Sequence, residues 1–129
     1  LVLKNHVHEL GACSDGELAS WMLHAQALLF PSFAEGYGMP MVEALQLGVP
    51  VLASKLPVFR EIAGHVPEYL DPIDGLGWSN AILAYADSNG SARSQQCARI
   101  GKFRAPTWRE HFEVVESLLE RFPAGDVRP

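Results

Sequence analysis

Two glutamates and two closely spaced glycines gather in the segment 31–45. One residue separates Gly36 from Gly38, and a loop with so few side chains lets backbone N–H groups approach a ligand closely. The loop leads into an expected helix, whose free N–H groups and dipole would favour a phosphate. Carboxylates accept hydrogen bonds from sugar hydroxyls, so Glu35 and Glu43 are candidate ligands for a polyol. The alternative interpretation is a tight turn with two solvated glutamates.

Strands are expected where short apolar or β-favouring runs end at a glycine or proline. These runs are 6–10, 27–30, 50–53 and 68–70. The second and third are continuous rather than alternating, which is typical of strands buried on both faces of a parallel sheet. Lys55, just after the third, lies on the same rim as Glu35 and could reach a phosphate, with a solvated lysine as the alternative.

Helices are expected between and after these strands. Two capping boxes, Ser14–Glu17 and Thr107–Glu110, mark helix starts. Further helices are expected over 40–47, 57–63, 76–87 and 92–103. The side chains expected to face inward are Leu18, Trp21, Met22 and Ala25 on the first helix and Trp108, Phe112, Val115, Leu119 and Phe122 on the last. Because strands alternate with helices, the fold class is α/β, a Rossmann-like parallel sheet flanked by helices with a helical C-terminal region.

Composition argues against several other classes of protein. Ten Lys and Arg against fifteen Asp and Glu give a net charge of −5 over 129 residues, and no basic stripe is present, which argues against nucleic-acid binding. No apolar run approaches the roughly 20 residues that span a bilayer. Cys13 and Cys97 are interpreted as reduced thiols, and neither they nor the five histidines show metal-ligand spacing, so no metal is expected.

The segment 31–45 is similar to the signature of glycosyltransferase family 4, in which Pro-Ser is followed by Glu-Gly-aromatic-Gly-x-Pro and a second glutamate. As in that pattern, seven residues separate Glu35 from Glu43. The resemblance covers about residues 6–122. It continues in 9–18, 43–54, 59–64, 69–72 and at Trp108.

This resemblance implies the C-terminal half of a GT-B fold. Residues 1–122 would be a nucleotide-sugar (donor) binding domain, truncated at its N-terminal side, and 123–129 a loose tail. Glu43 would accept hydrogen bonds from the ribose, and Glu35, the catalytic residue, would orient the donor sugar. The other donor-binding positions are the backbone of Gly36, Tyr37, Gly38 and Met39, the turn Gly11, Ala12 and Cys13 near the base, and Ser32 behind the loop.

The implied enzyme is a retaining hexosyltransferase that takes its hexose from a nucleotide diphosphate sugar, with no cofactor and no obligatory metal. Residues 56–61 and 67–72 look most like bacterial transferases that build lipopolysaccharide O-antigen or capsule, which favours GDP-mannose over UDP-sugars. The location would be cytoplasmic, at most peripheral at the inner membrane face.

The family's basic residues for the diphosphate, and the domain that binds the glycan or lipid-linked acceptor, would precede Leu1. Any membrane contact would also reside in that missing part. The chain alone is therefore expected to be inactive.

Three alternatives remain open from the sequence. The first is a non-catalytic module that binds nucleotide sugars. The second is a glycoside hydrolase, which would need Glu35 and Glu43 on opposite sides of one bond, about 5 Å apart for retention or about 6.5–9.5 Å for inversion. The third is a sugar-nucleotide epimerase of the same twin-domain architecture.

Overall fold

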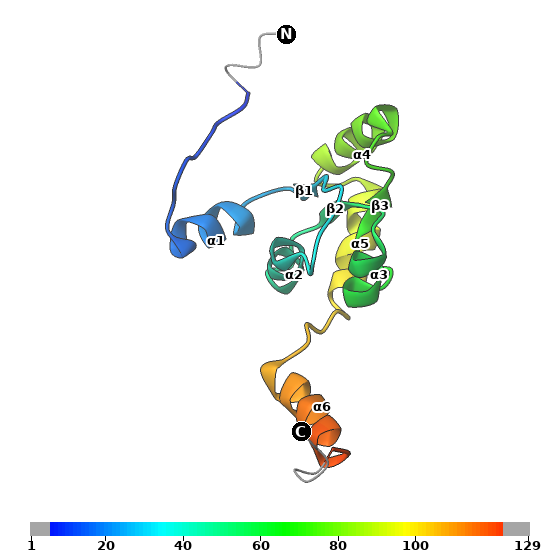
Figure 1. Cartoon of the computed structure of the whole chain (residues 1–129). Helices are drawn as coiled ribbons and strands as arrows, with labels where there is room; N and C mark the ends of the chain where they lie inside the picture. Colours follow the sequence, from blue (N-terminus) through cyan, green and yellow to red (C-terminus); the bar gives the residue numbers. More distant parts are fainter. Residues whose placement is uncertain (1–5, 123–129) are drawn as a thin grey trace.

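A three-stranded parallel sheet lies at the centre of the protein (Figure 1). The computed structural model describes residues 6–122, so the tail expected at 123–129 lies outside the described residues. The strands are β1 (Leu28–Phe30), β2 (Val51–Ser54) and β3 (Glu68–Leu70), in the order β1-β2-β3. The parallel α/β arrangement expected from the sequence is confirmed.

Within residues 6–122, six helices surround or extend from this sheet. They are α1 (Asp15–Leu23), α2 (Met39–Gln46), α3 (Pro57–Ala63), α4 (Gly75–Ala86), α5 (Ser91–Ile100) and α6 (Trp108–Glu120). Both expected capping boxes are present, at the starts of α1 and α6. Backbone and side-chain hydrogen bonds from the capping residues Ser14 and Thr107 lower the pKa of Glu17 and of Glu110.

The core is built around β2, all four residues of which are fully buried. Helices α2 and α3 supply much of the packing against this strand, and Phe59 of α3 stacks on Phe30 of β1 with ring centroids 5.4 Å apart. The Tyr69 hydroxyl donates to the backbone oxygen of Phe59 at 2.8 Å, which ties β3 to α3. Burial raises the pKa of Tyr69 to about 12.

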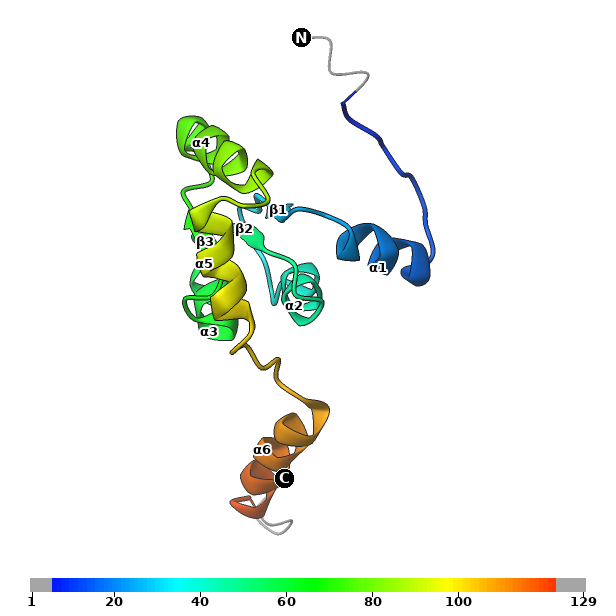
Figure 2. The same ribbon diagram turned by 180° about the vertical axis from the view of Figure 1, so that it is seen from behind.

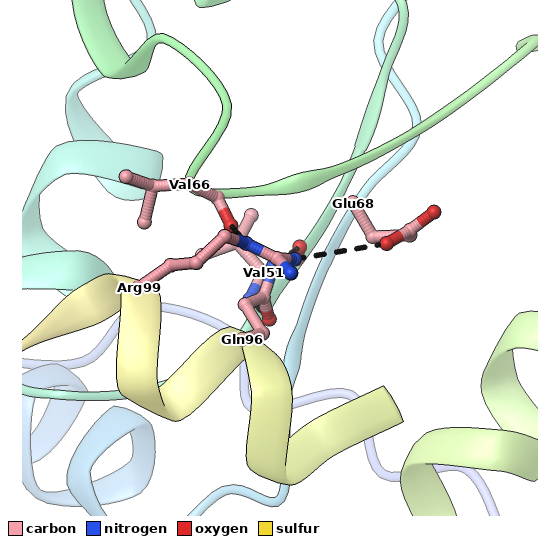
Figure 3. A network of polar contacts seen from close by, with 5 residues as sticks. All are labelled: Val51, Val66, Glu68, Gln96 and Arg99. Carbon is pink, nitrogen blue, oxygen red and sulfur yellow. Dashed lines mark hydrogen bonds and ion pairs between the residues drawn. The ribbon is translucent and has the colours of Figure 1, made fainter. Parts of the chain in front are cut away.

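Helix α5 is fastened to the start of β2 by a buried glutamine (Figure 3). The Gln96 amide donates to the oxygen of Val51 at 2.8 Å and accepts from its N–H at 2.9 Å, as a neighbouring strand would. One turn later Arg99 donates to the oxygen of Val66 at 3.2 Å and pairs with Glu68 at 3.8 Å. The Gln96 amide therefore bonds to β2 at Val51, one residue before the first residue of β2 that pairs with β3.

The strand expected at 6–10 is wrong. This segment has no strand structure, and Figures 1 and 2 show the chain running away from the sheet before α1, with no strand beside it to pair with. The expected inward face of α1 is only partly formed. Met22 is buried, whereas Leu18 and Trp21 are 43% and 59% exposed, because the helix meets the body of the protein through its last turn.

Two expectations of burial are also wrong. Leu29 in β1 is 44% exposed, because β1 is an edge strand with one face left uncovered. The last helix, α6, lies apart from the sheet in both views, joined to it by the segment 101–107. Its apolar residues therefore stay exposed, except for the half-buried Val115. The exposed residues that were expected to face inward are Trp108, Phe112 and Leu119, together with Phe122 just after the helix.

Candidate functional site

Three loops leave the sheet at the carboxyl ends of its strands, and parallel pairing brings them to one edge. They are residues 31–38 after β1, 55–56 after β2 and 71–74 after β3. Phe30 pairs with Ala53, and Ser54 pairs with Leu70, so the strand ends are in step. The glycine-rich loop predicted to carry the chemistry is the first of the three.

Gly38 links this loop to α2 and is required by the fold itself. It is the N-cap of the helix in the left-handed region, with φ of 89°. A Cβ placed there would lie 2.5 Å from Cε1 of Phe59. Gly36 differs, because a Cβ added there would meet nothing within 4 Å. The sequence pattern predicts the same role for both glycines, namely access to the backbone, whereas the structure shows a packing requirement at Gly38 alone.

The N-terminus of α2 has unpaired hydrogen-bond donors. No side chain caps it, which is also true of α3 and α5, whereas side chains cap α1, α4 and α6. The N–H of Met41 donates to the oxygen of Gly38 at 3.0 Å, and Pro40 has no N–H to offer. Within 6–122, none of the hydrogen bonds involves the N–H groups of residues 36–39. An anion at this corner would meet free donors and the positive end of a helix dipole.

Glu35 is exposed and is held by a neighbour in the same loop. The Ser32 hydroxyl donates to Oε1 of Glu35 at 2.7 Å. The second carboxylate oxygen has no partner among the residues that the structure describes, so it can accept from a sugar hydroxyl. Sequence spacing placed Ser32 near the site, but this hydrogen bond could not be read from the spacing.

Glu43 is the fifth residue of α2 and is half-buried. The two glutamates thus stand on either side of the helix start, one in the loop before it and one a turn beyond it. Tyr37 and Met39, between them, are 39% and 55% exposed. The N–H groups of residues 36–39 therefore lie, along the chain, between two carboxylates that can accept hydrogen bonds.

The predicted base-binding turn lies elsewhere. Gly11, Ala12 and Cys13 are exposed and precede α1, and Figures 1 and 2 show that helix between them and the sheet. The structure does not bring this turn to the loop 31–38. The role of these three residues stays a prediction from the resemblance.

The described part of the chain contains no cluster of side chains that could bind a metal ion. Among residues 6–122, no three His, Cys, Asp or Glu side chains are grouped to hold an ion. Cys13 and Cys97 are both free thiols. Within the same residues, no helix combines the length and the apolar character needed to cross a membrane.

Comparison with known proteins places the loop inside a family match. Residues 1–67, more than half of the chain, match the family described as glycosyl transferases group 1. This region contains β1, the loop 31–38, α2, β2 and α3. All of the predicted site residues therefore lie within the matched region.

Curated relatives extend the similarity further along the chain. The O-antigen chain mannosyltransferase RfbU of Salmonella typhimurium strain LT2 is 39% identical over 82 residues, which cover 64% of this chain and 23% of the relative. The serotype-specific mannosyltransferase WbdA of Escherichia coli is 33% identical over 113 residues, 85% of this chain and 13% of the relative. The O-antigen biosynthesis glycosyltransferase WclY of Escherichia coli is 39% identical over 107 residues, 81% and 30% respectively. The chain spans less than a third of the length of each.

Proposed function

Because the chain belongs to the glycosyl transferases group 1 family, we propose that it is the donor-binding part of a retaining glycosyltransferase. The donor is a nucleotide diphosphate hexose, and the acceptor is a glycan or a lipid-linked glycan of a cell-surface polysaccharide. The observation that carries this proposal is the uncapped start of α2, with free N–H groups at residues 36–39 and a glutamate on each side.

The donor is proposed to be GDP-mannose. Two of the relatives above are named mannosyltransferases, and two are named for the O-antigen. The base is the less supported half of this proposal, since the turn at 11–13 lies away from the loop. The acceptor would bind outside the described residues, and the reaction would take place in the cytoplasm.

Each site residue has a separate task in this proposal. The N–H groups of residues 36–39 receive the diphosphate and the sugar. Glu43 accepts hydrogen bonds from the ribose hydroxyls, and Glu35, held by Ser32, accepts from hydroxyls of the hexose. These contacts orient the donor and stabilise the charge that develops on the leaving group.

The transfer breaks the bond between the anomeric carbon and the diphosphate oxygen. The acceptor oxygen forms the new bond on the same face of the sugar, and its proton passes to the leaving diphosphate. This account gives retention without a covalent enzyme intermediate. Glu35 therefore does not have to act as a nucleophile, which agrees with its exposed position.

Calorimetric titration with GDP-mannose and GDP tests the proposal. Glu43→Ala removes the carboxylate that accepts hydrogen bonds from the ribose. It should weaken the affinity for both ligands about tenfold or more, because hydrogen bonds to a charged group contribute about 1.5–3 kcal/mol. Glu113→Ala on α6 is the matched control, since it removes an exposed carboxylate far from the loop. Equal weakening by both variants, or no binding by the parent chain, would contradict the proposal.

A further inference from the structure

The three loops at the carboxyl edge of the sheet carry more negative than positive charge. Glu35 lies in the first loop, and Asp71 and Asp74 lie in the third. Lys55, in the middle loop, is the one Lys or Arg in residues 31–38, 55–56 and 71–74. A nucleotide diphosphate brings at least two further negative charges to this edge, so a cation there would favour its binding.

The two aspartates are already engaged by the backbone. Oδ1 of Asp71 accepts from the N–H of Ile73 at 3.1 Å, and Oδ1 of Asp74 caps α4 by accepting from the N–H of Gly77 at 2.9 Å. Neither forms an ion pair with Lys55, because the ion pair found among residues 6–122 joins Arg99 to Glu68. The charge of Lys55 is therefore not neutralised by a carboxylate of the described chain.

The backbone of Lys55 is fixed at this edge, while its side chain is exposed. Its N–H donates to the oxygen of Leu70 at 2.7 Å, immediately after the central strand. Because Phe30 pairs with Ala53, the loop 31–38 leaves β1 beside the chain that enters Lys55. The long flexible stem of a lysine lets its ammonium group move toward a ligand at the neighbouring loop.

Other cations near the sheet have structural partners. Arg99 donates to the oxygen of Val66 and pairs with Glu68 on the side of the sheet where the strands begin (Figure 3). The Arg60 guanidinium lies 4.8 Å from the centre of the Tyr69 ring. Lys55 differs from both, because no hydrogen bond or ion pair of its side chain is formed with residues 6–122.

We propose that the Lys55 ammonium binds the diphosphate of the donor and stabilises the negative charge of the leaving nucleotide. This inference rests on the proposed function and adds a residue to the same site. The N–H groups of residues 36–39 supply neutral donors, and Lys55 supplies the one positively charged side chain within these three loops. Its effect is electrostatic, so it weakens as salt screens the charges.

The test is titration of the chain with GDP at low and high salt for the parent, Lys55→Ala, Lys55→Arg and Lys102→Ala. Lys102 is the matched control, an exposed lysine just after α5. We expect Lys55→Ala to weaken the affinity for GDP about three- to tenfold at low salt and less at high salt. The GDP affinities of Lys55→Arg and Lys102→Ala should stay near that of the parent. Amide spectra of the free variants confirm that each keeps the parent fold.

Three results would overturn the inference while leaving the proposed function in place. They are unchanged GDP affinity in Lys55→Ala, equal weakening by Lys102→Ala, and a loss that salt does not alter and arginine does not rescue. Failure of the parent chain to bind GDP, UDP or ADP would contradict the proposed function itself, and the inference would fall with it.

Discussion

At the residue scale, the two glycines of the loop show how one motif can combine a structural and a functional requirement. Gly38 has a left-handed backbone, and a Cβ added to it would clash with the Phe59 ring. Gly36 has open space around it, so packing does not explain why a side chain is absent. In the proposed function that space is where the donor approaches the backbone. The sequence predicts a glycine-rich ligand-binding loop, but it does not show that Gly38 is required for packing and Gly36 for access to the backbone.

Two alanine substitutions separate these reasons. Gly38→Ala should lower the free energy of unfolding by about 2–4 kcal/mol, because the new Cβ meets Phe59 in an unfavourable backbone region. Gly36→Ala should change it by less than about 0.5 kcal/mol yet weaken GDP-mannose binding. Urea unfolding and calorimetry measure the two effects. A stable, fully binding Gly36→Ala would show that the ligand does not approach this residue.

At the element scale, local signals predicted several helix starts and the bounds of two elements, whereas the helix expected over 92–103 ends at Ile100. The capping boxes before α1 and α6 were correct, as were α3 and β3 to the residue, because these features depend on neighbours in the chain. Burial was harder to predict. The apolar stripe of α6 is present but exposed, since periodicity reveals a face without revealing what covers it.

The attachment of α5 could not have been read from the sequence at all. Gln96 looks like any polar residue in a helix, yet it is fully buried and makes both of its bonds to Val51. Such a contact links residues 45 positions apart, which no local pattern reports. It holds the beginning of β2 in place, and Lys55 directly follows the other end of the same strand.

Removing this amide should destabilise the sheet. Gln96→Ala removes both hydrogen bonds of the amide to Val51 and leaves the buried N–H of Val51 without this partner, which should cost about 1–3 kcal/mol. Gln95→Ala is the control, because Gln95 is exposed on the same helix and its loss should cost less than about 0.5 kcal/mol. Thermal and urea unfolding of both variants give the comparison. A Gln96→Ala protein as stable as the control would mean that water replaces the amide.

At the scale of the whole molecule, the sequence predicted a parallel α/β sheet with its site at the carboxyl edge. The fold bears out the sheet and brings the loop, α2 and Lys55 to that edge. It does not bring the turn at 11–13 there, because the segment before α1 has no strand to pair with. Strand pairing depends on partners distant in sequence, so a β-favouring run alone was not sufficient.

The central claim is that the loop 31–38 and the start of α2 bind the nucleotide diphosphate sugar. Two-dimensional amide NMR spectra of the chain, recorded during titration with GDP, UDP and ADP, test it most directly. The account predicts shifts concentrated at residues 32–43 and at Lys55, largest for GDP and weakened by Glu43→Ala. Shifts confined to other elements such as α6, or none at millimolar nucleotide, would contradict it.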